Sequence, residues 1–211
     1  MPLVHVRNTI EHLVESGIIE GELANTWKER MTEKRDGEEK VKKFMKEANE
    51  GDANAMYNLA IWHIDGQYGL KGDVFEAYKW AKKGADMRHV ESMALAGSYL
   101  AEGVGTEQNL SDGLILTSLS AQQGCPSACM FLGNLYYRGD LGVVKNIENA
   151  KYWLRKALEE NVDTLNSNGM DLANQWLREI EALEAAGIGG DIGGNSENGD
   201  DSSEGESEDE D

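Results

Sequence analysis

The sequence lacks any long apolar run. No stretch approaches the roughly 20 apolar residues that a helix needs to cross a bilayer, so we expect no membrane-spanning segment and no membrane partner. The N-terminal residues, 1–13, also lack a charged start followed by a sustained apolar segment, which argues against a signal peptide. Together these absences predict a soluble intracellular protein in the cytoplasm, with the nucleus as the alternative compartment.

Cysteine is scarce as well. The 211-residue chain has two, Cys125 and Cys129, which lie four positions apart around Pro126. So low a content fits a reducing compartment. We expect Cys125 to be a turn residue and Cys129 to be a buried helix residue, and a disulfide between them is the alternative.

Basic residues are outnumbered. There are 39 Asp and Glu against 20 Lys and Arg, for a net charge of −19, and ten of the acidic residues lie in 187–211, which has no basic residue. The rest of the chain still carries about −9, which disfavours binding to nucleic-acid phosphates. One locally basic stretch, 28–46, has eight basic against five acidic residues. We interpret it as a solvated helix face, with a nucleic-acid site as the alternative.

Arrangements that could perform catalysis are also missing. The four histidines, His5, His12, His63 and His89, have no His or Cys partner at the spacing of a metal site. No phosphate-binding glycine loop follows a strand, and no nucleophile stands in a recognisable motif with a base. We therefore expect a protein that is not an enzyme and has no catalytic residue, cofactor or metal. His63 is expected to be a packed core histidine.

What the sequence does contain is a pattern that returns three times at a spacing of 36 or 37 residues. In each copy a small residue is followed by a bulky residue three positions later and by a glycine three positions after that. The copies are Leu59-Ala60 … His63 … Gly66, Ala96-Gly97 … Leu100 … Gly103 and Leu132-Gly133 … Tyr136 … Gly139. Self-similarity at this period is typical of stacked helical hairpins, which usually bind other proteins.

Each copy is predicted to form two helices joined by a glycine-marked loop. The first helix of the first copy runs over 53–64, because its apolar residues are three and four positions apart. A glycine after each first helix supplies the positive φ that ends a helix at low cost. The second helices are predicted over 73–86, 109–123 and 146–160, each beginning at a capping Asp or Asn. Their aromatic residues are expected to pack in the core: Tyr78, Trp80, Tyr152 and Trp153.

The repeat spacing divides the chain into an array, two caps and a tail. A half repeat, 37–51, with a helix over 37–49, precedes full repeats at 52–88, 89–124 and 125–161, so that the array spans 37–162. N-terminal capping helices are expected within 1–36, at about 9–14 and 21–34, and a C-terminal capping helix within 163–186, at about 171–184. The Gly-, Ser- and acid-rich tail, 187–211, cannot bury a core and is predicted to be disordered.

These residues resemble the Sel1-like repeat family, a relative of the tetratricopeptide repeat. The most similar copy is the third, which keeps Leu132-Gly133, Tyr136, Gly142-Val143, Ala150 and Trp153. The middle copy departs most, with Leu100, Gly113 and Leu116 where the family has Tyr, Ala and Trp, while the first has Ala60 and His63 for Gly and Tyr. The resemblance covers about 43–160. It implies an all-α, right-handed α/α superhelix (a solenoid) of about three hairpins that acts as an adaptor or scaffold, since the family shares architecture and not chemistry.

By the same resemblance, the first helices line the concave face of the solenoid, where a protein or peptide partner would bind. A groove that combines Tyr, Ile and Met with Asn and Arg suits an extended peptide or a partner helix. The resemblance places on this face Asn54, Tyr57, Ile61, Ile64, Asp65, Glu91, Ala94, Ser98, Ala101, Ser127, Met130, Asn134, Tyr137 and Arg138. The alternative is that they are merely exposed helix positions.

Other functions stay open at this point. The chain could be a repeat subunit or a fragment of a larger enzyme complex such as a ubiquitin ligase, although the zinc-binding Cys and His framework of a ligase domain is absent from the sequence. One branch of the family is secreted, disulfide-rich and binds or hydrolyses β-lactams. Its paired cysteines lie eight residues apart, whereas Cys129 has Ala121 at the position of its mate, so we reject this hydrolase branch. The acidic tail could instead bind basic proteins as a histone chaperone does.

Overall fold

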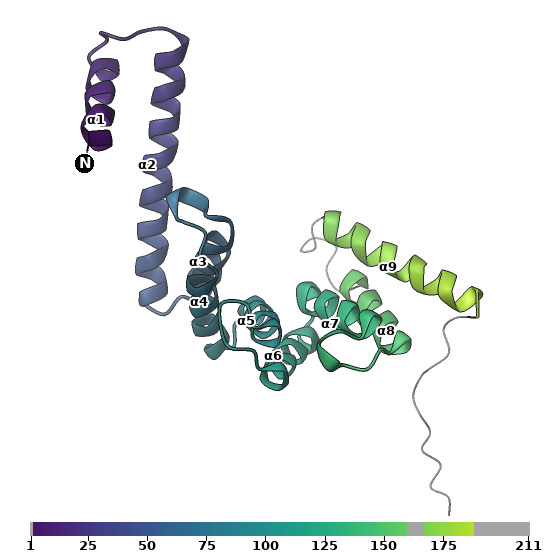
Figure 1. Cartoon of the computed structure of the whole chain (residues 1–211). Helices are drawn as coiled ribbons and strands as arrows, with labels where there is room; N and C mark the ends of the chain where they lie inside the picture. The colour runs from purple at the N-terminus through teal and green to yellow at the C-terminus, as the bar shows by residue number, and fades with distance from the viewer. Residues whose placement is uncertain (1, 160–166, 188–211) are drawn as a thin grey trace, which may run out of the picture.

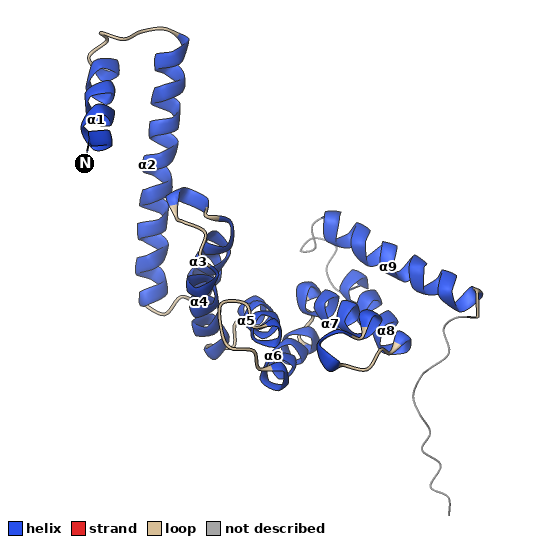
Figure 2. Ribbon diagram, viewed as in Figure 1, coloured by secondary structure: helices blue, strands red, loops and turns tan. Residues whose placement is uncertain are grey.

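The structure, a computed structural model, describes residues 2–159 and 167–187 (Figure 1). These residues form helices and loops, without a strand among them (Figure 2). The elements are α1 (Pro2–Glu15), α2 (Glu22–Asn49), α3 (Ala53–Asp65), the 3₁₀ turn η1 (Gln67–Gly69), α4 (Val74–Asp86), α5 (Val90–Glu102), α6 (Leu110–Gln122), α7 (Pro126–Arg138), the 3₁₀ turn η2 (Asp140–Gly142), α8 (Ile147–Glu159) and α9 (Ser167–Ala185). The predicted all-α class is confirmed.

Helix α2 corrects one prediction. The sequence suggests a helix that ends near Lys34 and another that begins near Gly37, but α2 continues through both positions as a single helix of 28 residues. Gly37 is buried because η1 approaches it: a Cβ added there would lie 3.2 Å from Tyr68 Cα. The glycine therefore serves close packing and does not end the helix.

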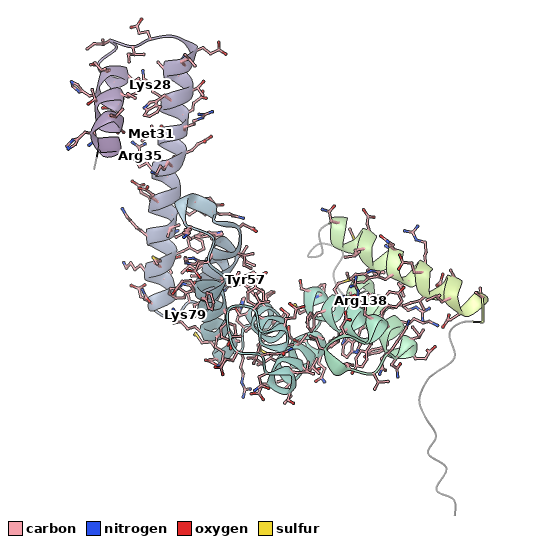
Figure 3. All side chains as sticks on the ribbon, viewed as in Figure 1. Lys28, Met31, Arg35, Tyr57, Lys79 and Arg138 are labelled. Atoms are coloured by element: carbon pink, nitrogen blue, oxygen red, sulfur yellow. The ribbon has the colours of Figure 1, made fainter. Side chains whose placement is uncertain are left out.

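The N-terminal half of α2 extends beyond the repeats, and α1 lies alongside it in the opposite direction (Figure 1). The basic stretch 28–46 lies on α2, with charged side chains such as Lys28 and Arg35 exposed (Figure 3). Ion pairs one helical turn apart, for example Lys34 with Glu38 at 3.7 Å, place acidic residues beside the basic ones. This arrangement fits the predicted solvated helix face.

The three predicted hairpins are α3–α4, α5–α6 and α7–α8, and their ends follow the predicted chemistry. Each first helix ends at a glycine in the left-handed conformation, with φ of 67° at Gly66, 77° at Gly103 and 72° at Gly139. Each second helix begins at a side chain that accepts hydrogen bonds from first-turn amides. For example, Asp73 Oδ1 accepts from the backbone N–H groups of Phe75 and Glu76 at 3.0 and 3.2 Å.

The core of the array repeats with the sequence pattern. Leu59, Ala96 and Leu132 occupy equivalent interior positions, with exposed fractions of 0%, 0% and 2%. His63 is buried as predicted, and neither of its ring nitrogens has a hydrogen-bond partner among the described residues. The close contact between α7 and α8 depends on a glycine. A Cβ added to Gly133 on α7 would lie 2.7 Å from Leu154 Cγ on α8.

The aromatic residues of the second helices are not all in the core. Trp80 is buried, and Tyr78 and Trp153 are half-buried against the core. Tyr152 is 57% exposed, so its prediction as a core residue is wrong. Its neighbour Trp153 takes the inward position, and successive residues of a helix point about 100° apart. The two rings meet edge to face, with centroids 4.9 Å apart.

The hairpins follow a curved path in which the first helices form the inner side (Figure 1). Helix α3 packs against α5, and α5 packs against α7, in addition to the contacts within each hairpin. Helix α9 closes the array against α7 and α8, with Ala173 and Ile180 fully buried beside Ala150 and Leu154. It begins before the predicted cap over 171–184. The predicted disordered tail lies outside the described residues except for Gly187.

Candidate functional site

At the α3–α5 end of the inner face, a hydrogen-bonded cluster centred on His89 lies beside Tyr57. His89 caps α5 by accepting from the backbone N–H of Ser92 at its Nδ1, at 3.3 Å. This leaves Nε2 to donate to Asn54 Oδ1, 3.0 Å away on α3. The His89 ring lies 5.6 Å from the Tyr57 ring, and Glu91 Oε2 lies 3.3 Å from Nε2. His89, which the sequence did not single out, therefore bonds one predicted groove residue, Asn54, and lies beside another, Tyr57.

The electrostatic surroundings of Tyr57 are unfavourable to its phenolate. Partial burial raises the pKa of the Tyr57 hydroxyl, and nearby Cys125 and Glu91 raise it further. Like any tyrosine hydroxyl it is protonated at neutral pH, so it can donate a hydrogen bond to a partner.

The central part of the inner face is acidic. Asp65 and Glu102 are the last residues of α3 and α5, and both are exposed. Partial burial raises the pKa of the Tyr99 hydroxyl, as do the negative charges of Glu102 and Asp65, so these three groups lie near one another. Although Glu102 is exposed, partial loss of water raises the pKa of its carboxyl. Two other predicted residues, Ile61 and Ile64, are half-buried beside this region.

A pocket of about 260 Å³ lies where the second repeat meets the third. It is lined by Glu102, Phe131, Asn134, Leu135, Asp140 and Leu141. Asn134 Oδ1 is buried and has no hydrogen-bond partner among the described residues. The equivalent residue in the second repeat, Ser98, satisfies its hydroxyl by donating to the carbonyl of Leu95 at 3.0 Å. The two predicted groove residues therefore differ, since Asn134 still has an unused acceptor.

Helix α9 contacts part of the predicted face in the third repeat. The Tyr137 hydroxyl donates to Glu179 Oε2 on α9 at 3.1 Å, and Met130 packs against the core that α9 completes. Arg138, the last residue of α7, is exposed and lowers the pKa of the neighbouring Tyr137 hydroxyl, although burial and Glu179 raise it overall. Figure 3 labels Tyr57 on α3 and Arg138 on α7, toward the two ends of this inner face.

Two residues expected in the groove are not there. Ala94 and Ala101 have exposed fractions of 6% and 0%, so both belong to the core. Ala101 faces its own hairpin partner: a Cβ added to Gly113 on α6 would lie 2.5 Å from the Ala101 backbone nitrogen. Glu91 and Ser127, by contrast, are exposed. The equivalent residues of the first repeat, Tyr57 and Ile64, are only half-buried, so the two repeats differ at these positions.

The cysteines take the positions that the sequence predicts. Cys125 precedes α7 as its N-terminal boundary residue, and Cys129 is fully buried within the helix. Neither forms a disulfide. Cys129 Sγ lies 3.7 Å from the carbonyl oxygen of Ala121, at the contact where the disulfide-rich branch would have its second cysteine.

The residues that the structure describes contain neither a candidate membrane span nor a candidate metal site. None of these helices combines the length and the apolar content that a bilayer crossing requires. Within the same residues, potential metal ligands do not gather in groups of three or more.

The match to a known family agrees with the helical frame. The model of the Sel1 repeat matches residues 53–89, 90–125 and 126–162, just over half of the chain. The chain belongs to the Sel1 repeat family. Each matched unit begins at the first residue of a first helix, Ala53, Val90 or Pro126, one position after the predicted repeat boundary. The resemblance to the Sel1-like repeat family that the sequence pattern indicates is confirmed.

Individual relatives extend this finding. A segment of 59 residues, 28% of this chain, is 37% identical to the ERAD-associated E3 ubiquitin-protein ligase component HRD3A of Arabidopsis thaliana, of which it covers 9%. A Sel1 repeat protein from Oxalobacter formigenes has the same fold, with a TM-score of 0.58 at 22% identity over 85% of this chain and 61% of that one. The protective antigen c5321 of uropathogenic Escherichia coli, which displays an SLR fold, has a TM-score of 0.50 at 25% identity over 69% of this chain and 36% of that one. The Sel1 repeat solenoid is thus established, and the chain spans only part of each relative.

Proposed function

We propose that this Sel1 repeat chain is a non-catalytic adaptor that binds a protein or peptide partner along the inner face of α3, α5 and α7. The observation that carries the proposal is the cluster around Tyr57, which holds an aromatic side chain half-exposed on that face. Aromatic side chains in such positions dominate the energy of many protein interfaces. The proposal includes that the chain acts inside the cell. The two cysteines support this, because they form no disulfide.

The cluster supports binding because it places an ordered histidine ring beside Tyr57, with the ring centroids 5.6 Å apart. His89 is held from both sides, by the Ser92 amide at Nδ1 and by Asn54 Oδ1 at Nε2. A side chain that is already ordered loses less conformational entropy when a partner binds. The remaining part-exposed residues of the face, among them Ile61, Ser98 and Arg138, then supply contact area around it.

Partner capture with the full chain tests this proposal. The chain is used as bait in an extract of its own cells, and the recovered proteins are compared between wild type, Tyr57→Ala and Tyr152→Ala. Tyr152 is the matched control, because it is an exposed tyrosine on the outer helix α8. We expect Tyr57→Ala to reduce recovery of the partner at least tenfold and Tyr152→Ala to leave it unchanged, with both variants keeping the helical circular-dichroism spectrum. The reverse pattern would place the partner on the outer helices and overturn the proposal.

A second candidate function is a role as a repeat subunit of a ubiquitin ligase complex, which the 37% identity to HRD3A favours. The complex purified through this chain would then transfer ubiquitin to a substrate or to itself when supplied with activating and conjugating enzymes and ATP. The isolated chain would not do so. Absence of ligase activity from a complex that retains the Tyr57-dependent partner would remove this candidate and leave the adaptor proposal intact.

A further inference from the structure

We propose that the pocket between the second and third repeats selects an extended partner segment in which an apolar side chain stands next to a lysine or arginine. This inference rests on the proposed function and adds to it the chemistry of the partner. The pocket supplies three features that such a segment would match: an unused hydrogen-bond acceptor, an apolar wall and two carboxylates.

The acceptor is Asn134 Oδ1. It is buried without a partner among the described residues, which is a costly state for an amide oxygen. The equivalent positions on the inner face do not share this property. Ile61 has no polar atom in its side chain, and the Ser98 hydroxyl is bonded to its own helix. Because this oxygen is covered while the side chain is part-exposed, Asn134 must turn toward the pocket before a backbone N–H of an extended segment can satisfy it, and that donor is available in a peptide of any sequence.

The apolar wall accounts for one side-chain preference. Phe131 and Leu141 are half-buried and Leu135 is buried, and all three line the same pocket. Leu141 sits in η2 with a φ of 55°, a conformation that a bulky residue rarely adopts. Tyr68 in η1 has nearly the same φ, 54°, so this turn conformation recurs in the repeats and here places Leu141 at the pocket. A volume of about 260 Å³ accommodates one aliphatic side chain and not a folded element.

The carboxylates account for the neighbouring cation. Glu102 and Asp140 line the pocket, and neither forms an ion pair within the described part of the chain. Asp65 adds negative charge on the side of the first repeat, near Tyr99 and Glu102. Arg138 is the exposed cation at the end of α7. It lowers the pKa of the neighbouring Tyr137 hydroxyl and does not line the pocket. A lysine or arginine of the partner would therefore meet opposite charge at this point.

The same charges argue against an acidic occupant. The chain's own tail carries ten acidic residues and no basic one between 187 and 211, so like-charge repulsion would oppose its entry. An acidic segment of another protein would meet the same repulsion. The preference of the pocket for basic over acidic peptides is therefore the quantity that tests the inference.

A display library of random twelve-residue peptides, selected on the full chain, provides the probe. We expect the enriched peptides to share an aliphatic residue beside Lys or Arg. One enriched peptide, labelled with a fluorophore, is then titrated by anisotropy against wild type and three variants. Glu102→Gln and Asn134→Leu should each weaken binding about tenfold, and Glu159→Gln, the same charge change on the outer helix α8, should leave it unchanged. Raising the salt concentration should weaken binding to wild type more than to Glu102→Gln.

The outcomes separate this inference from the proposed function. Enrichment of acidic peptides, failure to enrich any peptide, or equal binding by wild type, Glu102→Gln and Asn134→Leu would overturn the inference. If capture of the native partner still depends on Tyr57, the adaptor function survives that result. Should Asn134→Leu unfold, as its thermal melt would reveal, the exposed Glu102→Gln substitution and the salt dependence still decide the matter.

Discussion

The first and middle repeats reach the same hairpin geometry through different side chains. In the first repeat α4 packs through Trp80, which is buried and has Lys83 Nζ 3.9 Å from its ring centroid. The middle repeat has Leu116 at the equivalent position, and this smaller side chain is only half-buried against the core. The middle repeat therefore obtains less apolar burial from the residue that is an aromatic anchor in its neighbours.

The middle repeat gains close packing and polar contacts instead. Where the first repeat has Ala60 and Ala77, it has Gly97 and Gly113, and both glycines are in contact with backbone atoms of the opposite helix. The Ser120 hydroxyl donates to the carbonyl of Val90 at 2.7 Å, which ties the second helix to the start of the first. Helix contacts built from small residues and hydrogen bonds depend on short distances, so this repeat should tolerate added volume poorly.

The aromatic anchor provides the largest test of this difference. Trp80→Ala should lower the free energy of unfolding by about 3–5 kcal/mol, because it leaves a cavity in a fully packed core. Leu116→Ala removes fewer buried atoms and should cost less than about 2 kcal/mol. Denaturation in urea, followed by circular dichroism, measures both. Equal losses would mean that the two repeats do not differ in how they are anchored.

The glycine contact provides the second test. In Gly113→Ala the new Cβ would lie 2.5 Å from the Ala101 nitrogen and 2.7 Å from the Gly97 carbonyl oxygen, and backbone atoms cannot move aside as side chains do. We expect a loss of about 1–3 kcal/mol, larger than the gain of about 1 kcal/mol that alanine gives an unhindered helix position.

The matched variant for this test is Ala77→Gly, which makes the first repeat resemble the middle one. It removes a methyl group from a buried position and should cost about 1 kcal/mol from helix propensity, together with a loss of packing. If Gly113→Ala instead stabilised the chain, the two helices of the middle repeat would not be in the close contact described here.

The sequence predicts those features that are decided locally. Helix ends at Gly66, Gly103 and Gly139 follow from conformations that glycine adopts at low cost, and caps such as Asp73 follow from side chains that reach their own first turn. The repeat spacing then fixes which residues are equivalent. For this reason the interior positions of Leu59 and its counterparts were predictable without a structure.

Features that depend on distant contacts were not predictable in this way. Gly37 is read as a helix boundary in the sequence, and only the approach of Tyr68 explains why the interior of α2 has a glycine there. His89 meets Asn54 across 35 positions of sequence, and the one available signal was its place just before α5, where the first repeat has the capping residue Asp52. The unused acceptor of Asn134 is a property of its surroundings and has no counterpart in the sequence pattern.

The smallest predicted effect concerns pH and compares the ends of α3 and α5. Partial loss of water raises the pKa of the Glu102 carboxyl in the folded chain above its value in the unfolded chain. The folded state then binds this proton more readily, so the contribution of Glu102 to stability is greatest at low pH and is lost as the pH rises through the folded-state pKa.

Glu102→Gln cannot ionise and should remove this loss, so that its stability falls less than that of wild type between about pH 4 and pH 7. Urea midpoints measured across this range test the expectation, and the difference should be small because the side chain is exposed. Asp65→Asn, which removes one carboxylate from the equivalent position of the first repeat, is the control for the change in net charge. If both variants alter the pH dependence equally, the effect belongs to the overall negative charge of the chain and not to the surroundings of Glu102.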